Sequence, residues 1–239
     1  MNKHENGVLD WAEQTERDPD AGLDIQAAAR RFLRDLDSGK WDWRPEEAEM
    51  IILTIETLFC HQQGEDLWGR PLRGTPLVLQ PWQLFSVYNL FGFYVPGTEL
   101  RRFLEGFFML ARKNGKTPFA TSMAWAAGLR YCKSFSKVKT VAGSLQQNME
   151  GFRFLSYNLH RLGLTAQEDP VHGLRVLDSS MGHSFSGPIW DGMISFDALA
   201  FKPELFDSFN GNIVHLDELE LYKNATPYTR LGDSTKAYR

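Results

Sequence analysis

Residues 111–117 read Ala-Arg-Lys-Asn-Gly-Lys-Thr and carry the strongest indication of the fold. A short, mostly apolar run at 103–111 leads into it as a strand candidate, and a helix candidate at 119–129 follows. A loop between a strand and a helix can turn its backbone N–H groups toward an anion, and a glycine allows close approach. The lysine then reaches the β and γ phosphates, and the hydroxyl serves Mg²⁺. The stretch predicts a phosphate-binding loop; the alternative, an exposed turn with a solvated lysine, is disfavoured by the flanking elements.

Two residues depart from the general phosphate-loop pattern. Leu110 stands where the full pattern has its first glycine, and Pro118 follows Thr117 directly. Proline has no N–H, and the amide at this place in phosphate loops helps to hold the α-phosphate. The sequence therefore predicts a looser grip on the α-phosphate, with affinity depending more on the β and γ contacts. Because proline is tolerated in a first helical turn, we still expect the helix to form.

A second part of a nucleotide site is an acid at the end of a neighbouring strand. The run 212–218, Asn-Ile-Val-His-Leu-Asp-Glu, is β-prone and ends in two acids, about a hundred positions after Lys116. Asp217 is suited to hold Mg²⁺ through its water shell, and Glu218 to polarise the attacking water. The alternative is an acidic pair that begins a solvated turn. His215 has no partner at metal-binding spacing, so a packed or hydrogen-bonded histidine is expected.

The rest of the chain predicts an α/β fold with a mostly parallel central sheet flanked by helices. Helical spacing predicts one helix capped by Asp24, a second from Pro45 to before Gly64, and a third from Pro81. Strand candidates lie at 137–142, 174–177, 193–196 and 212–216, alternating with helical segments. We expect an N-terminal helical lead-in at 1–65 and a P-loop ATPase domain at 66–239, joined through a loop at 64–76 rich in Gly, Pro and Arg.

Composition narrows the class of protein. The 239 residues are 43% apolar and carry a net charge of -4, which argues against a protein that coats nucleic acid with its whole surface. The first residues contain no secretory signal, and the apolar runs are far shorter than the roughly 20 residues that span a bilayer. Cys60 and Cys132 lack metal-ligand spacing, which predicts two buried thiols in a reducing cytoplasm.

From about Ala27 onward the chain resembles the large terminase subunits of tailed double-stranded-DNA bacteriophages. The resemblance rests on the following stretches: 30–36 (Arg-Arg-Phe-Leu-Arg-Asp-Leu), 79–83 (Leu-Gln-Pro-Trp-Gln), 100–103 (Leu-Arg-Arg-Phe), 111–117 and 216–218 (Leu-Asp-Glu). The loop of this family commonly carries an Arg or Lys early, which accounts for Leu110 in place of a glycine. The resemblance implies a P-loop NTPase fold of the additional-strand catalytic-glutamate type.

The resemblance also implies roles for individual residues. The nucleotide-binding set would be Gln83, Arg112, Lys113, Asn114, Gly115, Lys116 and Thr117. Within it Gln83 would recognise adenine; without the resemblance a glutamine here is interpreted as a surface residue that caps a helix turn. Arg112, Lys116 and Glu218 would be catalytic, with Arg112 near the γ-phosphate. Thr117 and Asp217 would hold Mg²⁺, and the helix start at 146–147 resembles a family segment near the nucleotide.

Partners follow from the same resemblance. They would be ATP, double-stranded DNA, the portal protein and the small terminase subunit, in the cytoplasm of a bacterial host and away from any membrane. Such motors act as rings on the prohead, whereas the domain alone could be a monomer. Large terminases also carry an RNase H-like nuclease, for which we expect no room here, because the chain ends at Arg239. A shortened chain and an incomplete gene product both remain open.

Two further readings stay open beside the packaging ATPase. One is another P-loop DNA translocase or helicase-like ATPase, and the other is a non-catalytic prophage remnant that acts as an assembly module. Basic residues that could face a DNA channel are Arg101, Arg102, Arg112, Lys113, Arg130, Lys133, Lys137 and Lys139. A solvated basic face is an equal alternative for those outside the loop.

Overall fold

The computed structural model describes residues 2–111, 113–131, 134–179, 182–189, 192–201, 211–219, 222, 226 and 228–229. The chain forms two compact units. The first comprises Met1–Thr57 and Val78–Leu110, and the second comprises Leu58–Leu77 and Ala111–Arg239. The boundary expected between residues 65 and 66 does not coincide with this division, because each unit is built from two separate stretches of chain.

The first unit is mainly helical. It contains α1 (Glu5–Arg17), α2 (Leu23–Asp37), α3 (Pro45–Leu58, whose last residue belongs to the second unit) and α4 (Pro81–Phe91), with the short paired strands β1 (Asp42–Trp43) and β2 (Phe93–Tyr94). The three predicted helices are confirmed, and α1 was not predicted. Asp24 lies in the first turn of α2, where its charge suits the helix dipole, whereas Gly22 occupies the capping position.

Aromatic side chains form the core of the first unit. The Phe32 ring lies 5.3 Å from the Phe85 ring and 5.7 Å from the Phe93 ring, both edge-on. Asp35, one turn after Phe32 on α2, forms a mostly buried ion pair with Arg102. The Arg102 guanidinium also lies over the rings of Trp41 and Phe103, at 4.4 and 4.5 Å from their centroids. These contacts give the stretches 30–36 and 100–103 a structural role in one core.

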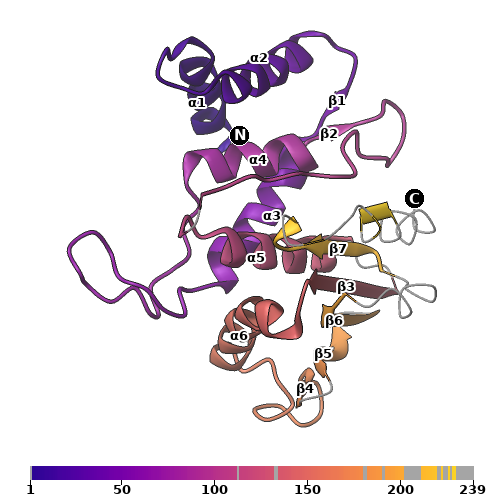
Figure 1. The fold of residues 1–239 in the computed structure, drawn as a ribbon. Helices are drawn as coiled ribbons and strands as arrows, with labels where there is room; N and C mark the ends of the chain where they lie inside the picture. The colour runs from indigo at the N-terminus through magenta and orange to yellow at the C-terminus, as the bar shows by residue number, and fades with distance from the viewer. Residues whose placement is uncertain are drawn as a thin grey trace. The chain divides into compact units, whose positions relative to one another are not determined.

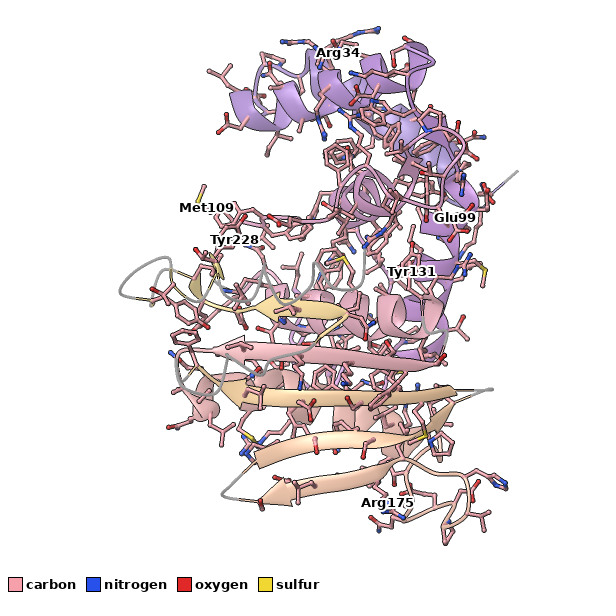
Figure 2. The ribbon with its side chains drawn as sticks, turned by 90° about the vertical axis from the view of Figure 1, so that its right-hand side faces the viewer. Arg34, Glu99, Met109, Tyr131, Arg175 and Tyr228 are labelled. Carbon is pink, nitrogen blue, oxygen red and sulfur yellow. The ribbon has the colours of Figure 1, made fainter. Side chains whose placement is uncertain are left out.

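The second unit is built on a five-stranded sheet in the order β4-β5-β6-β3-β7. The strands are β3 (Phe135–Ala142), β4 (Arg175–Ser179), β5 (Gly182–Ile189), β6 (Gly192–Ala200) and β7 (Ile213–Leu216). β3 pairs in parallel with β6 and with β7, whereas β4, β5 and β6 are joined antiparallel. The sheet is therefore mixed, with its parallel part at β6-β3-β7. In Figure 2 Arg175 marks the outer strand β4.

Two helices pack side by side against this sheet, α5 (Lys116–Arg130) and α6 (Leu145–Arg161) (Figure 1). Alternate residues of the strands are buried beneath them, among them Val138, Phe185 and Phe196. Asn148 of α6 donates from its side-chain amide to the Thr140 carbonyl at 2.6 Å and the Leu199 carbonyl at 3.1 Å. This residue ties the start of α6 to the ends of β3 and β6.

The segment 58–77 packs on α6, which is why it belongs to the second unit. The Asn158 side chain accepts from the Cys60 N–H at 2.7 Å and donates to the Cys60 carbonyl at 3.1 Å. Phe59 stacks on Phe154 with 5.5 Å between ring centroids. The predicted loop at 64–76 is confirmed, since only isolated bridges form within it. Cys60 is buried as a free thiol, as predicted, and Cys132 lies outside the described residues.

The strand predicted at 103–111 does not form, so this prediction was wrong. These residues have no regular secondary structure, and Phe107 and Met109 are 74% and 85% exposed. The Met109 side chain projects away from the ribbon in Figure 2. A strand requires a hydrogen-bonding neighbour, and none of the described residues pairs with this run.

Among the described residues, no helix combines the length and the apolar character that a membrane crossing requires.

Candidate nucleotide site

The predicted phosphate loop leads directly into α5. Gly115 caps the helix with φ 69° and ψ 22°, a left-handed conformation that glycine adopts without steric cost. Lys116 and Thr117 are the first two helical residues, and the helix continues through Pro118 as expected. Since the first amides of a helix have no intrahelical acceptor, this end of α5 presents N–H groups and the positive end of the helix dipole to an anion.

Asp217 lies against the start of α5. Its Oδ1 is 3.3 Å from Lys116 Nζ, and its Oδ2 accepts from the Thr117 hydroxyl at 3.4 Å. The Asp217 residue is 7% exposed. One carboxylate thus contacts both the lysine and the hydroxyl of the loop, which brings the two predicted halves of the site together.

The parallel pairing of β7 with β3 positions Asp217. Leu216 pairs with Val141 in register, and the Asp217 N–H donates to the Val141 carbonyl at 2.9 Å, so Asp217 lies just beyond the carboxyl end of the strand. Val141 is fully buried, and the partly buried Leu199, Phe201, Val214 and Leu216 pack against it. This apolar cluster fixes the strand end that carries the acid.

Glu218 follows with an unusual backbone. Its φ is 51°, in the left-handed region, and its N–H donates to Asp217 Oδ1 at 2.9 Å. A left-handed non-glycine residue costs roughly 1–2 kcal/mol, and such residues gather at functional sites. The charge of its carboxylate also affects the hydroxyl of Tyr222, a residue that was not predicted from the sequence. Burial, Asp217 and Glu218, in that order, raise the pKa of Tyr222 above its ordinary value.

His215 lies on β7 beside the candidate site, packed within the protein as predicted. Its Nδ1 is buried without a hydrogen-bond partner among the described residues, as is Oγ1 of Thr140, its partner on β3. Burial lowers the pKa of His215; Asp217 opposes this shift and Lys116 adds to it. The ring is therefore neutral near pH 7, which suits a position beside the Lys116 cation.

Helix α6 packs closely on α5 beside the site. A Cβ at Gly151 would lie 2.7 Å from Thr121 Oγ1 and 3.5 Å from Thr117 Cγ2, so only glycine allows this approach of α6 to α5. At the start of α6 the Ser144 hydroxyl accepts from the Gln147 N–H at 3.3 Å. Gln147 thus belongs to a helix cap, and Gln146 is exposed.

The remaining predicted residues have local contacts. Lys113 is exposed with φ 67°, and the Asn114 side chain donates to the Ala111 carbonyl at 3.3 Å, bridging the loop. Arg112 lies outside the described residues. Gln83 belongs to the first unit, where it is 7% exposed and its Oε1 accepts from the Gln80 N–H at 2.7 Å. This is the helix-capping geometry considered above; the adenine role of Gln83 stays a prediction.

The oxygen donors of the site fit Mg²⁺. Thr117 and Asp217 supply a hydroxyl and a carboxylate, the hard ligands that Mg²⁺ prefers. Within the described part of the chain no group of three or more His, Cys, Asp or Glu side chains is arranged to hold a metal. Mg²⁺ at phosphate sites is typically held by one or two carboxylates together with substrate oxygens, so the pair is sufficient for that mode of binding.

Several of the basic residues predicted to face DNA have ion-pair or aromatic partners within the protein. Arg102 is paired with Asp35 in the first unit, and Lys139 is paired with Asp197 at 2.8 Å in the second. Three others lie over aromatic rings: Arg101 over Phe91, Arg130 over Tyr131 and Lys137 over Phe135. Lys133 lies outside the described residues. A DNA-facing role for these residues stays a prediction.

Comparison with known proteins shows the fold. No protein-family model matches the chain, and no curated protein sequence matches it. The crystal structure of the HK97 bacteriophage large terminase is similar, with a TM-score of 0.53 and 18% identity, over 80% of this chain and 36% of that chain. The chain therefore spans little more than a third of the terminase chain that it matches. The expected α/β fold, with helices packed on the sheet, is confirmed; the sheet is parallel at β6-β3-β7 and antiparallel at β4-β5-β6.

Proposed function

We propose that this chain is the ATP-hydrolysing domain of a viral DNA-packaging motor of the large-terminase type. The observation that carries the proposal is the Asp217 carboxylate in contact with both Lys116 and Thr117 at the glycine-capped start of α5. A likeness in fold to the HK97 bacteriophage large terminase supports the motor assignment. The sequence resemblance in the loop and at the acidic strand end supports it independently.

Each residue of the site has a chemical role in this proposal. The Lys116 ammonium is paired with Asp217 in this structure and would pair with the β and γ phosphates instead when ATP binds. The free amides at the start of α5 would hold phosphate oxygens, with Pro118 unable to contribute one. Thr117 and Asp217 would hold Mg²⁺, which supplies neutralisation of the charge that develops during phosphoryl transfer.

Glu218 is the proposed catalytic base. Its left-handed backbone ends the extended conformation of β7, and its N–H donates a hydrogen bond to Asp217. In this proposal the two adjacent acids therefore have different tasks. Glu218 would accept a proton from the water that attacks the γ-phosphate. Arg112 would stabilise the charge on the transferred group, and Gln83 would contact adenine through its amide nitrogen, since its oxygen caps α4.

The remaining assignments concern the whole motor. Double-stranded DNA, the portal protein and the small terminase subunit are proposed partners, and a ring on the prohead is the proposed active assembly. All of these derive from the sequence resemblance. The nuclease activity of large terminases is not assigned to any residue described above.

Phosphate release from ATP tests the proposal. The purified chain should hydrolyse ATP in the presence of Mg²⁺. Duplex DNA should raise the rate, and this stimulation should decrease as the salt concentration rises. Lys116→Ala and Glu218→Gln should each reduce the rate by about 10²-fold or more, while Glu218→Gln keeps ATP binding. Nucleotide binding without turnover in the unaltered chain would favour the assembly module. Turnover unaffected by either substitution would show that hydrolysis occurs elsewhere.

A further inference from the structure

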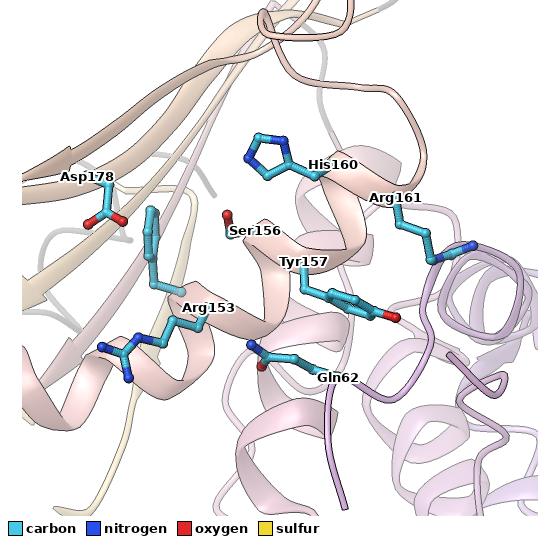
Figure 3. Close-up of a pocket in the computed structure, with 8 residues that line it drawn as sticks. Gln62, Arg153, Ser156, Tyr157, His160, Arg161 and Asp178 are labelled. Carbon is cyan, nitrogen blue, oxygen red and sulfur yellow. The ribbon is translucent and has the colours of Figure 1, made fainter. Parts of the chain in front are cut away.

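A hollow lined by both polar and apolar side chains lies on the second unit, along α6 (Figure 3). It has a volume of about 560 Å³ and is lined in part by Arg153, Tyr157, His160 and Arg161 of α6, by Gln62 of the 58–77 segment and by Asp178 of β4. A hollow of this size can accommodate a small ligand. Figure 3 shows Tyr157 and Gln62 between the two arginine side chains.

This hollow is distinct from the candidate nucleotide site. Gly151 faces α5, where its neighbours are Thr121 and Thr117. Arg153 and His160 come two and nine positions after Gly151, which at about 3.6 residues per turn places both roughly half a turn away from α5. The two sites therefore lie on opposite faces of α6.

The charges in the hollow favour an anion. His160 is paired with Glu168 at 2.8 Å, and Asp178 is paired with His183 at 2.7 Å. By contrast, within the described ranges no carboxylate pairs with Arg153 or Arg161. Arg161 donates to the Leu58 carbonyl at 2.8 Å. Among the residues that the structure describes, the guanidinium groups of Arg153 and Arg161 therefore have no counterion.

Two contacts support the side of the hollow formed by Gln62 and Tyr157. Asn158 clamps the backbone of Cys60 two positions before Gln62, and the guanidinium of Arg73 lies 5.1 Å from the centre of the Tyr157 ring. Arg73 adds a third positive charge beside Tyr157. The arginine, tyrosine, serine and glutamine side chains are hydrogen-bond donors suited to phosphate oxygens, while Asp178, the carboxylate among the lining residues, is paired with His183.

The spacing of the arginines sets the size of the anion. Arg153 and Arg161 are eight positions apart, which corresponds to about 12 Å along the helix. A single phosphate would engage one of them, whereas a chain of phosphates can engage both. We propose that this hollow is a second anion site, which binds a ligand carrying two or more phosphate groups, either a free polyphosphate or the backbone of a nucleic acid.

Calorimetric titration with sodium tripolyphosphate tests this site in the full chain. The Lys116→Ala background disables the candidate nucleotide site, and one molecule of tripolyphosphate per chain should still bind. Adding Arg153→Gln should weaken that binding about tenfold, and Arg161→Gln further. Arg175→Gln is the matched control, since Arg175 lies three residues from Asp178 and faces the other side of β4. Its affinity should not change.

Two outcomes would overturn the proposal: tripolyphosphate that binds the unaltered chain but not Lys116→Ala, or equal affinity with and without Arg153→Gln. Arg161→Gln also removes the contact to Leu58, so the single Arg153→Gln variant carries the decision. Fluorescence anisotropy with a duplex oligonucleotide then separates the sources. If the ligand is DNA, Arg153→Gln should make the slope of log K against log salt concentration shallower by about 0.9 per lost phosphate contact. If DNA affinity is unchanged while tripolyphosphate binding weakens, the source is a free polyphosphate.

Discussion

The Thr117 hydroxyl donates to the Asp217 carboxylate at 3.4 Å across 100 positions of sequence. The same carboxylate lies 3.3 Å from the Lys116 ammonium, so the first turn of α5 and the end of β7 are joined by charge as well as by packing. The Asp217 carboxylate thus neutralises the charge of Lys116 until an anion of higher charge binds. A triphosphate is such an anion, because it offers several negative oxygens to one lysine.

Pro118 is expected to limit nucleotide affinity. Replacing it with alanine restores an N–H in the first turn of α5, and this amide should contact the α-phosphate. Pro118→Ala should therefore tighten the binding of ADP and ATP by up to about tenfold. Unchanged nucleotide affinity, measured by calorimetry, would contradict the looser α-phosphate grip.

Glu218 should show a conflict between stability and function. Its φ of 51° favours glycine, so Glu218→Gly should be more stable than Glu218→Ala by about 1 kcal/mol. Both substitutions should abolish hydrolysis, because both remove the carboxylate. Denaturant unfolding of the two variants measures the difference. Equal free energies of unfolding would show that the backbone at 218 is not constrained.

Gly151 should tolerate no side chain. A methyl group there would approach Thr121 Oγ1 to 2.7 Å, so Gly151→Ala should destabilise the second unit by about 1–3 kcal/mol. The displaced α6 should also disturb Thr117 and weaken ATP binding. Gly182→Ala is the control, because a methyl group at Gly182 has no neighbour within 4 Å. Thermal unfolding that does not distinguish the two variants would be inconsistent with close packing of α5 on α6.

The Asp35–Arg102 ion pair should hold the first unit together. Asp35→Asn would leave Arg102 mostly buried between aromatic rings without its counterion, at a cost of about 3–5 kcal/mol. Asp37→Asn, on the exposed side of the same helix, should cost less than about 0.5 kcal/mol. Urea unfolding of both variants compares them. A small loss in Asp35→Asn would show that the pair contributes little.

Local signals in the sequence were sufficient for much of the fold. Proline at the first position predicted the starts of α3 and α4, and helical spacing predicted α2. The β-prone runs within β3, β4, β6 and β7 were also predicted. β5 was not, because its outward-facing Ser184 and Ser186 and its Pro188 dilute the apolar signal, although Phe185 is fully buried.

Long-range relationships were harder to predict. The run 103–111 has the composition of a strand, but strand formation depends on a partner that composition does not specify. At the candidate site, the glycine-lysine turn and the acids Asp217 and Glu218 carried recognisable patterns. Gly151, Asn148 and Tyr222 did not, because a close helix approach, a bridging amide and a ring beside two acids arise only when the chain folds.

Calorimetric measurement of ATP binding to the full chain, in the presence of Mg²⁺, is the decisive experiment for a nucleotide site formed by Lys116, Thr117 and Asp217. Lys116→Ala and Asp217→Asn each remove one partner of the Lys116–Asp217 ion pair. Asp197→Asn is the control, because Asp197 pairs with Lys139 elsewhere on the sheet. We expect one ATP per chain, at least about tenfold weaker binding in Lys116→Ala, and loss of the Mg²⁺ dependence in Asp217→Asn. Absence of ATP binding, or equal binding by Lys116→Ala and the unaltered chain, would contradict this expectation.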